Sequence, residues 1–376
     1  MHSLKEADLN GKTVFLRADL DVALVNGEIE DDTRLQSAIP TIEYLLKQNA
    51  RIIIAGHLGR PSPKSQISPV PKGGNLKSQI GTNKNDFSLR PAARWFADKL
   101  KIENCKFKVR DLSGFEGWEI GPDIFLLENL RFYKEEEKND PEFSKKLASL
   151  ADIYVNEAFA NSHRNHASIA GVPKYLPHFA GFHLQQEIEV LSKVLKNPDR
   201  PFIVIIAGAK LETKLPLVEA MHRIADYVLV GGKLAEDIKT LFKIQHEKIE
   251  GRKSALLIAD LKPKEEDITE KSIENFLQIV DLAKTIVWNG PLGKTSNDKT
   301  RIIVSEEGSR KLAEGLVKSS AYTIVGGGDT VGFLEKACLL DSFACLSRNR
   351  CFLSTGGGAM LSLLSGEKLP GVEALI

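Results

Sequence analysis

Short apolar runs rich in β-branched residues alternate with longer amphipathic segments along this chain of 376 residues, and this alternation limits its fold more than any other feature. The runs predicted as strands are residues 13–16, 51–55, 124–127, 153–155, 202–207, 227–230, 255–259, 285–288, 322–325 and 351–354. Helical patterns lie at 34–48, 89–100, 141–151, 217–224, 268–283 and 303–317. Most of the predicted strands are apolar on both faces, which is typical of parallel sheets covered by helices. The alternation therefore predicts an α/β fold with doubly wound sheets.

Proline and glycine divide the predicted strands into two sets. Residues 171–181 contain two prolines and two glycines, a helical pattern follows at 182–196, and Asn197-Pro198-Asp199-Arg200-Pro201 ends it. At about 100–200 residues per domain, the length also favours two domains. We therefore predict two doubly wound parallel-sheet (Rossmann-like) domains with a cleft between them, and a single large twisted sheet is the alternative. The predicted parts are an N-terminal domain over 1–172, a hinge and connecting helix over 173–200, and a C-terminal domain over 201–364.

Composition excludes several classes of protein. Lys and Arg total 51 and Asp and Glu total 50, a net charge of +1, which argues against nucleic acid or a membrane surface as a partner. No apolar stretch is long enough to span a bilayer, and residues 1–6 lack the core of a signal peptide. The four cysteines form no CxxC pair, so disulfides and a zinc site are not expected. These features predict a cytoplasmic protein whose anion sites come from local clusters.

Basic residues follow the predicted strands of the first half. Guanidinium groups offer a planar fork of donors that suits carboxylate and phosphate, and ligands of open α/β sheets bind beyond the carboxyl ends of the strands. The cluster therefore predicts a site for a small polyanion, although each arginine could instead pair with a neighbouring acid. His163 and His166 lack a carboxylate at ligand spacing, so no metal site is predicted there. The basic residues at these positions are Arg17, Arg34, His57, Arg60, Arg131, His163 and Arg164.

Glycine-rich turns follow the predicted strands of the second half. Such turns let backbone N–H groups approach a phosphate, and Asp329 behind one of them is a natural Mg²⁺ ligand. Lys210 and Lys214 flank the start of a helix that Pro216 places near Thr213. Together these features favour a nucleotide site, whereas any one triple glycine alone could be a tight turn. Neither GxxxxGK[ST] nor GxGxxG is present, which argues against a P-loop and a dinucleotide oxidoreductase. The turns are Gly208-Ala209-Lys210, Gly231-Gly232, Asn289-Gly290-Pro291, Gly326-Gly327-Gly328 and Gly356-Gly357-Gly358.

In this order the motifs resemble the phosphoglycerate kinase family over nearly the whole chain. The most specific passages are Asp31-Asp32-Thr33-Arg34, His57-Leu58-Gly59-Arg60-Pro61, Leu127-Glu128-Asn129-Leu130-Arg131-Phe132, Val287-Trp288-Asn289-Gly290-Pro291, Gly326-Gly327-Gly328-Asp329-Thr330 and Ser354-Thr355-Gly356-Gly357-Gly358. The resemblance implies a glycolytic enzyme that transfers a phosphoryl group reversibly between 1,3-bisphosphoglycerate and ADP, giving 3-phosphoglycerate and ATP. It implies that the N-terminal domain binds phosphoglycerate, that the C-terminal domain binds Mg-nucleotide, and that transfer is in line after domain closure. It also implies a monomer whose tail, residues 365–376, packs on the N-terminal domain.

The resemblance also implies roles for the residues that match its motifs. Asp329 is the implied Mg²⁺ ligand, and the catalytic groups around the transferring phosphoryl are Arg34, Lys210, Gly327 and Gly328. The implied phosphoglycerate pocket consists of Asp19, Asp21, Arg34, His57, Arg60, Arg131 and Arg164. The implied nucleotide contacts are Gly208, Ala209, Lys210, Lys214, Gly231, Gly232, Asn289, Pro291, Gly326, Gly327, Gly328, Asp329 and Thr330.

Several positions depart from the family pattern. Asp21 stands where asparagine is usual, so an extra carboxylate would raise a carboxyl pKa or weaken anion binding unless an arginine compensates. On the nucleotide side the departures are Thr213 for aspartate, Lys233 for a third glycine, Ser296 for the glutamate that engages the ribose, and a shortened stretch over 244–281. In the N-terminal half, the loop over 61–86 is longer than the family pattern. Two alternatives therefore stay open. One is a kinase of this fold with another nucleotide or acceptor, and the other is a catalytically weak binding or regulatory protein.

Overall fold

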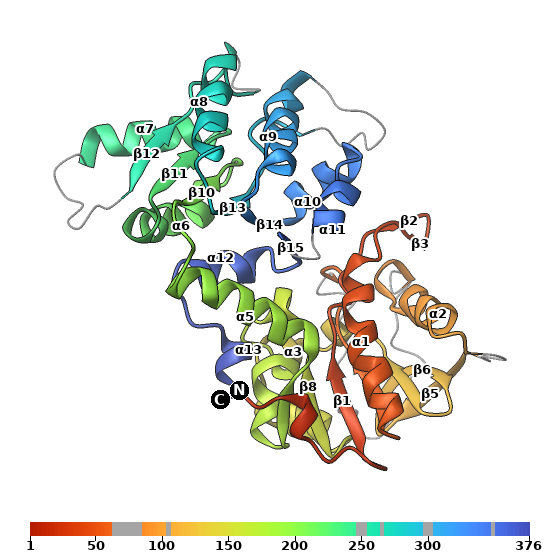
Figure 1. The fold of residues 1–376 in the computed structure, drawn as a ribbon. Helices are drawn as coiled ribbons and strands as arrows, with labels where there is room; N and C mark the ends of the chain where they lie inside the picture. Colours follow the sequence, from red (N-terminus) through yellow and green to blue (C-terminus); the bar gives the residue numbers. More distant parts are fainter. Residues whose placement is uncertain (62–84, 103–106, 246–253, 264–266, 296–303, 347–349) are drawn as a thin grey trace. The chain divides into compact units, whose positions relative to one another are not determined.

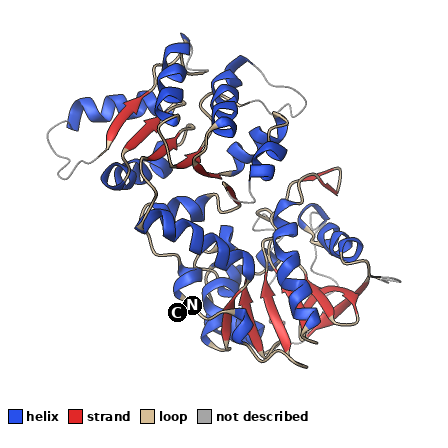
Figure 2. Cartoon of the chain, in the orientation of Figure 1, coloured by secondary structure: helices blue, strands red, loops and turns tan. Residues whose placement is uncertain are grey.

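The computed structural model describes residues 1–61, 85–102, 107–245, 254–263, 267–295, 304–346 and 350–376. Most of the predicted loop over 61–86, part of the stretch 244–281, and Ser296 lie outside the described residues. The chain divides into two compact units: unit 1 comprises Met1–Ile188 with Lys368–Ile376, and unit 2 comprises Glu189–Glu367. Each unit is a sheet with helices on both of its faces, which confirms the α/β prediction (Figure 2).

Unit 1 is built on a seven-stranded sheet with the order β5-β6-β7-β4-β1-β8-β9. Its strands are β1 (Thr13–Arg17), β4 (Arg51–Ala55), β5 (Lys108–Leu112), β6 (Phe115–Gly121), β7 (Ile124–Leu127), β8 (Ile153–Asn156) and β9 (His178–Ala180). From β7 to β9 the pairing is parallel, and the order of the strands reverses between β1 and β8. A small antiparallel pair, β2 (Leu24–Val25) and β3 (Glu28–Ile29), stands apart from this sheet.

The prediction of an entirely parallel sheet is wrong for unit 1. β5 pairs antiparallel with β6, and β6 pairs antiparallel with β7. The reason is local, because only Ser113 and Gly114 separate β5 from β6, with φ of 54° and 90°. Two residues with positive φ form a tight hairpin, whereas a parallel connection needs a crossover of a dozen residues or more.

The helices of unit 1 bury the apolar residues of the sheet. Residues of β1 alternate between its faces, and Val14 and Leu16 share one core with Leu35 and Ile42 of α1. The same core receives Phe96 of α2 and extends over β4, β6 and β7. The helices are α1 (Thr33–Lys47), α2 (Arg90–Lys99), α3 (Lys134–Glu137), α4 (Pro141–Ala148), the unit 1 part of α5 (Phe182–Lys196) and α13 (Pro370–Glu373), as Figure 1 shows.

Unit 2 is built on a six-stranded sheet that is parallel throughout, with the order β12-β11-β10-β13-β14-β15. The order reverses between β10 and β13, so β10 and β13 flank the switch point at which doubly wound sheets bind ligands. The strands are β10 (Phe202–Ile206), β11 (Tyr227–Val230), β12 (Ala255–Ile258), β13 (Thr285–Asn289), β14 (Tyr322–Gly326) and β15 (Cys351–Ser354).

Helices cover both faces of this sheet (Figure 1). Phe276 of α8 and Leu312 of α9 share one core with Ile205 and Trp288 of the strands, while α6 contacts α12 on the opposite side of the sheet. The helices are α6 (Leu211–Ile224), α7 (Leu234–Gln245), α8 (Glu270–Val280), α9 (Glu307–Lys318), α10 (Gly328–Lys336), α11 (Leu340–Leu346) and α12 (Gly358–Leu364). Within the described ranges, none of the helices combines the length and the hydropathy that crossing a bilayer requires.

The start predicted for α6 near Thr213 is wrong. The helix begins at Leu211, so Pro216 lies in its second turn rather than its first. Proline there removes the hydrogen bond to the carbonyl of Glu212. Glu212 is exposed, so water can satisfy that carbonyl and the helix tolerates the proline.

Candidate functional site

The carboxyl ends of four neighbouring strands of unit 1 carry the predicted polyanion site. β7, β4, β1 and β8 are adjacent in the sheet, so the segments that follow them meet at one edge. All seven of the predicted phosphoglycerate residues belong to one electrostatically connected cluster there. These residues are Asp19, Asp21, Arg34, His57, Arg60, Arg131 and Arg164.

Arg34, on the first turn of α1, is half-buried between two carboxylates. Its Nε lies 3.5 Å from Asp19 Oδ2, its Nη1 lies 3.8 Å from Asp21 Oδ2, and its Nη1 also donates to the Asp21 carbonyl at 2.8 Å. Asn161 donates to the other oxygen of Asp19 at 3.0 Å. The guanidinium is thus held in place at the edge of the sheet before any ligand arrives.

Asp21 is ionised in this setting. Burial opposes its ionisation, but His57, the Gly59 amide that donates to Oδ1 at 2.8 Å, and Arg34 together hold its pKa well below the ordinary value. Arg34 is thus the arginine beside the extra carboxylate, but His57 and the Gly59 amide contribute more than Arg34 to the low pKa of Asp21. Asp21 is itself an anion inside the predicted anion site.

Arg131 and Arg164 supply donors that no described residue uses. Arg131 Nη1 donates to the Gly59 carbonyl at 2.6 Å and Nε lies 3.2 Å from Glu137, but its buried Nη2 has no partner among the described residues. Arg164 Nε is likewise buried and without a hydrogen bond in that part of the chain. Burial lowers the pKa of both groups, that of Arg131 to about 10, and repulsion from Arg164 adds to the shift of Arg131 as repulsion from Arg60 adds to that of Arg164. Such unsatisfied cationic donors point to an anionic ligand.

Three buried residues, Arg17, Ser168 and Glu136, lie behind this cluster, and sequence reasoning placed only Arg17 among the basic residues of the anion site. Arg17, at the end of β1, is fully buried, and its Nη2 lies 2.9 Å from His57 Nδ1. Its Nε donates to Ser168 Oγ at 2.9 Å, and Ser168 donates in turn to the buried Glu136 at 2.6 Å. Arg17 follows the strand predicted over 13–16, but Ser168 and Glu136 lie in no motif, so only the fold reveals their link to Arg17.

His166 is buried beside the cluster. Across the described ranges, no group of three His, Cys, Asp or Glu side chains is placed to hold a metal ion. Burial lowers the pKa of His166 to about 3, and Arg17, Arg131 and Arg164 add to the shift by repulsion. His166 is therefore neutral and buried beside Glu136, 3.7 Å from its carboxylate.

In unit 2, the turns after β10, β11 and β13 approach one another closely around the switch point. The φ of Gly232 is 64°, and a Cβ at this position would lie 2.8 Å from the Gly208 nitrogen. Gly208 accepts a hydrogen bond from the Leu234 amide at 2.9 Å. The chain therefore needs glycine here, because a side chain at Gly232 would push the turns apart.

The end of β13 joins these turns to the first triple glycine. Lys214 Nζ donates to Asn289 Oδ1, and Asn289 Nδ2 donates to the Gly326 carbonyl at 3.0 Å. Thr330 Oγ1 accepts from the Gly290 amide at 2.8 Å. The predicted nucleotide residues Lys214, Asn289, Gly326 and Thr330 therefore form one bonded network.

The remaining predicted residues of unit 2 surround this network. Lys210 is exposed immediately before α6, and Gly327, with a φ of 98°, precedes α10. The N–H groups of a helix start are donors for an anion. Ala209 and Gly328 are exposed, whereas Gly231 and Pro291 are buried beside the same turns. The second triple glycine follows β15, the strand next to β14, and leads into α12.

Asp329 is the predicted Mg²⁺ ligand. It is exposed on the first turn of α10, and its charge acts on Lys214. A single carboxylate cannot by itself complete the coordination of Mg²⁺, but Mg²⁺ commonly binds through one or two carboxylates together with substrate phosphates. The donor set therefore fits Mg²⁺ that is held jointly by Asp329 and a nucleotide.

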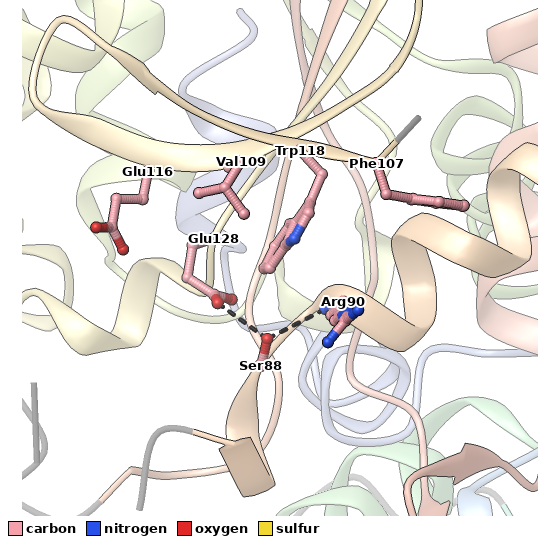
Figure 3. Close-up of a pocket in the computed structure, with 8 residues that line it drawn as sticks. Ser88, Arg90, Phe107, Val109, Glu116, Trp118 and Glu128 are labelled. Atoms are coloured by element: carbon pink, nitrogen blue, oxygen red, sulfur yellow. Dashed lines mark hydrogen bonds between the residues drawn. The ribbon is translucent and has the colours of Figure 1, made fainter. Parts of the chain in front are cut away.

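A separate pocket of about 320 Å³ lies in unit 1 (Figure 3). Glu128 accepts hydrogen bonds there from Ser88 Oγ at 3.0 Å and from the Leu89 amide at 2.9 Å. None of the predicted site residues lines it. Its walls are Ser88, Arg90, Phe107, Val109, Glu116, Gly117, Trp118 and Glu128.

Comparison with known proteins places the chain in a family. The family model described as phosphoglycerate kinase matches residues 4–264 and 240–367. Phosphoglycerate kinase of Dictyoglomus turgidum is 37% identical, and cytosolic phosphoglycerate kinase 3 of Arabidopsis thaliana is 39% identical, each alignment covering 99% of this chain and 97% of the relative.

Solved structures agree with the sequence relatives. Phosphoglycerate kinase of Coxiella burnetii matches with a TM-score of 0.74 at 31% identity, covering 100% of this chain and 98% of the other. The enzyme of Pyrococcus horikoshii matches with a TM-score of 0.73 at 27% identity over the same shares. The family model, the sequence relatives and the solved structures all cover nearly the whole chain, so this chain belongs to the phosphoglycerate kinase family of phosphotransferases.

Proposed function

We propose that this protein catalyses the reversible transfer of a phosphoryl group between 1,3-bisphosphoglycerate and ADP, giving 3-phosphoglycerate and ATP. The observation that carries the proposal is the pair of buried guanidinium donors, Arg131 Nη2 and Arg164 Nε, that have no partner among the described residues. Buried charged donors are costly unless a ligand satisfies them, and a phosphorylated carboxylic acid offers several anionic oxygens.

The cluster in unit 1 would bind phosphoglycerate. His57, Arg60, Arg131 and Arg164 would contact its anionic oxygens, while Asp19 and Asp21 keep Arg34 oriented. Arg34 would then stabilise the phosphoryl group as it transfers. Phosphoryl transfer needs little covalent help from protein, so positioning and charge stabilisation account for most of the rate.

The glycine turns of unit 2 would bind the nucleotide. Gly208, Ala209, Gly231, Gly232, Asn289, Pro291 and Thr330 would form the walls of that site, with Lys214 beside the phosphates. The backbone N–H groups of Gly327 and Gly328, together with Lys210, would share the transferring group with Arg34, and Asp329 would hold Mg²⁺, which neutralises phosphate charge when bound. Transfer in line requires the two units to close on one phosphoryl group, and closure would also exclude water.

We place the protein in the cytoplasm and expect a monomer. The location is supported by relatives that are named as cytosolic enzymes. A monomer accords with sites that each unit builds from its own residues.

A coupled assay tests the function directly. The protein is supplied with 3-phosphoglycerate and ATP, GTP or another nucleotide, with and without Mg²⁺. We expect Mg²⁺-dependent turnover with ATP. Turnover only with another nucleotide would select the kinase of altered preference, and ligand-induced stabilisation without any turnover would select a binding protein.

Arg34→Ala is the matched variant for this assay. Loss of an arginine that serves the transferring group costs about 10³–10⁵ in rate, so we expect no measurable turnover from a protein that remains folded. Arg110→Ala is the control, because Arg110 is exposed on β5 and pairs only with Glu119 among the described ion pairs. An Arg34→Ala variant that keeps more than about a tenth of wild-type activity would contradict the role assigned to this arginine.

A further inference from the structure

We propose that Arg17, held by Ser168 and Glu136, is a positioning residue that fixes His57 as a neutral imidazole with its proton on Nε2, directed into the anion site. The tautomer follows from the geometry alone. Only the identity of the anion that accepts from His57 rests on the proposed function.

The three nitrogens of the Arg17 guanidinium are each directed at one acceptor. Nε donates to Ser168 Oγ, Nη1 donates to the Ala18 carbonyl, and Nη2 lies 2.9 Å from His57 Nδ1. Arginine remains protonated in proteins and has no acceptor atom. The contact with His57 is therefore possible only if Nδ1 accepts, which requires that Nδ1 carries no proton.

Ser168 and Glu136 fix the direction of the remaining hydrogen bonds. Ser168 Oγ accepts from Arg17, so its own proton must go to Glu136 Oε1, 2.6 Å away. Glu136 Oε2 accepts from the Ser168 amide at 2.9 Å. Both residues are fully buried, so water cannot offer Arg17 an alternative arrangement. The guanidinium is thereby clamped from the side opposite to His57.

The proton that Nδ1 cannot carry belongs on Nε2. This nitrogen is buried and makes no hydrogen bond to any described residue, its nearest charged neighbour being Asp21 Oδ2 at 3.6 Å. His57 is only 1% exposed and follows β4, at the same edge as Arg131 and Arg164. The nearest acceptor for this N–H is the Asp21 carboxylate, which lies just beyond hydrogen-bond distance, so the N–H remains available to an anionic ligand oxygen beside the unused guanidinium donors.

The groups that face His57 keep it neutral. Burial is the largest influence and lowers the pKa of His57 well below its ordinary value, repulsion from Arg17 and Arg131 lowers it further, and Asp21 opposes the shift. His166, whose ring centroid lies 6.4 Å away, is itself neutral. His57 would therefore donate one uncharged hydrogen bond at every pH between about 5.5 and 8, unlike an ordinary histidine.

Nitrogen NMR of the ¹⁵N-histidine-labelled full chain tests this, with His178 as an internal reference. His178 Nδ1 lies 2.9 Å from the Pro173 carbonyl and 3.0 Å from the Leu176 carbonyl, so neutral His178 must carry its proton on Nδ1. We expect opposite tautomers for the two residues, and no titration of His57 between about pH 5.5 and 8. A proton on Nδ1 of His57, or protonation of both of its nitrogens in that range, would overturn the proposal.

Arg17→Met removes the donors and keeps most of the apolar stem. We expect His57 to populate both tautomers in this variant while His178 stays unchanged, and 3-phosphoglycerate to bind about tenfold more weakly, the usual loss for a hydrogen bond to a charged group. An unchanged His57 spectrum would refute the role of Arg17. Should the variant not fold, Ser168→Ala and the wild-type spectrum decide the same question. A wild-type protein with the expected tautomers but no kinase turnover would support this inference and refute the proposed function.

Discussion

Lys214 is half-buried on α6 beneath the turns that we assign to the nucleotide. Burial lowers the pKa of Lys214 to about 8, although the charge of Asp329 opposes the shift. A lysine binds phosphate only when protonated, so we expect ADP affinity to fall as the pH rises through about 8. Titration calorimetry with ADP between about pH 7 and 9.5 measures this fall.

Two variants test whether Lys214 causes the pH dependence of ADP affinity. Lys214→Gln should bind ADP weakly and without the pH dependence. Lys284→Gln changes an exposed lysine immediately before β13, at the opposite end of that strand from Asn289, and should retain the wild-type profile. A wild-type affinity that stays level across this range would show that another group carries the charge.

Among single residues, the sequence predicts those that stand in motifs and misses the buried residues that hold the motif residues in position. Arg34, His57 and Arg131 were predictable because each follows a strand or opens a helix at one sheet edge. Glu136 was not, because its contact with Ser168 joins residues 32 positions apart that no short pattern connects. The ionised state of Asp21 also needed the fold, since it depends on the Gly59 amide and on the position of Arg34.

Among the elements, α5 begins on an unusual buried carboxylate. Glu157 accepts hydrogen bonds from Thr41 Oγ1 at 2.6 Å and from the His183 amide at 3.1 Å, at the first turn of the helix. Burial raises the pKa of Glu157 to about 7 in spite of these bonds. The folded protein therefore binds a proton more readily here than the unfolded chain does.

The consequence is a stability that declines as the pH rises. Below the unfolded pKa near 4.5, Glu157 is protonated in both the folded and the unfolded state. Between that value and about 7 the unfolded chain loses this proton while the folded protein keeps it, so the free energy of unfolding falls as the pH rises. Above about 7 the carboxylate is ionised in both states, and the folded protein bears the whole cost of burying the charge. That cost is about 3 kcal/mol at 1.36 kcal/mol per pKa unit. Urea denaturation from pH 4.5 to 8 should show this decline in wild type and a flatter curve for Glu157→Gln. Parallel curves for the two proteins would contradict it.

Two glycines of unit 2 should respond to alanine in opposite ways. Gly290 has a φ of 98°, and an added Cβ would lie 2.0 Å from the Ala207 carbonyl oxygen, so Gly290→Ala should cost about 3 kcal/mol. Gly332 lies inside α10 with open space around it, so Gly332→Ala should stabilise unit 2 by about 0.5–1 kcal/mol. Denaturant unfolding measures the change in stability of each variant. Equal changes for Gly290→Ala and Gly332→Ala would contradict the prediction.

Strong periodicity made some elements predictable. Each predicted strand is present with ends that differ by one residue at most, because apolar β-branched runs bounded by turns have few other solutions. β5 and β6 were missed because charged residues interrupt them, and α10 and α12 because both begin with glycines. Glycine is a weak helix former, so these helices depend on tertiary packing that sequence alone does not display.

At the scale of the whole molecule, the end of the chain belongs to unit 1. Leu369 and Leu375 are buried there, the Gly371 amide donates to the Ser162 carbonyl at 2.8 Å, and Asn156 Nδ2 donates to the Gly371 carbonyl at 3.2 Å. We expect deletion of residues 368–376 to destabilise unit 1 by about 3–6 kcal/mol, from the two leucines alone. Hydrogen exchange should show the loss in peptides of unit 1 and not in those of unit 2.

Removal of Ile376 alone is the control, because this residue is 78% exposed. It should leave exchange in unit 1 almost unchanged. Equal exchange in the wild-type and deleted proteins would mean that the tail contributes no net stability.

Prolines and glycines predict a hinge and connecting helix over 173–200, whereas units 1 and 2 divide inside α5, between Ile188 and Glu189, where no proline or glycine stands. The parallel core of unit 1 and the whole sheet of unit 2 follow from their apolar strands. Hydrophobic periodicity could not predict the contacts of the C-terminal tail with unit 1. The contacts of Gly371 are made by backbone groups and by the amide side chain of Asn156, which leave no periodic pattern in the sequence.

The antiparallel hairpin at the border of unit 1 has a consequence for self-association. β5 is the outermost strand of its sheet, and its backbone is a template onto which another chain could add a strand. Lys108, Arg110 and Asp111 are exposed along it, so a second copy that added a strand there would have to remove water from these charges. We therefore expect the edge strand β5 to resist the addition of further strands. Replacing these three residues with threonine should make the folded protein aggregate at high concentration.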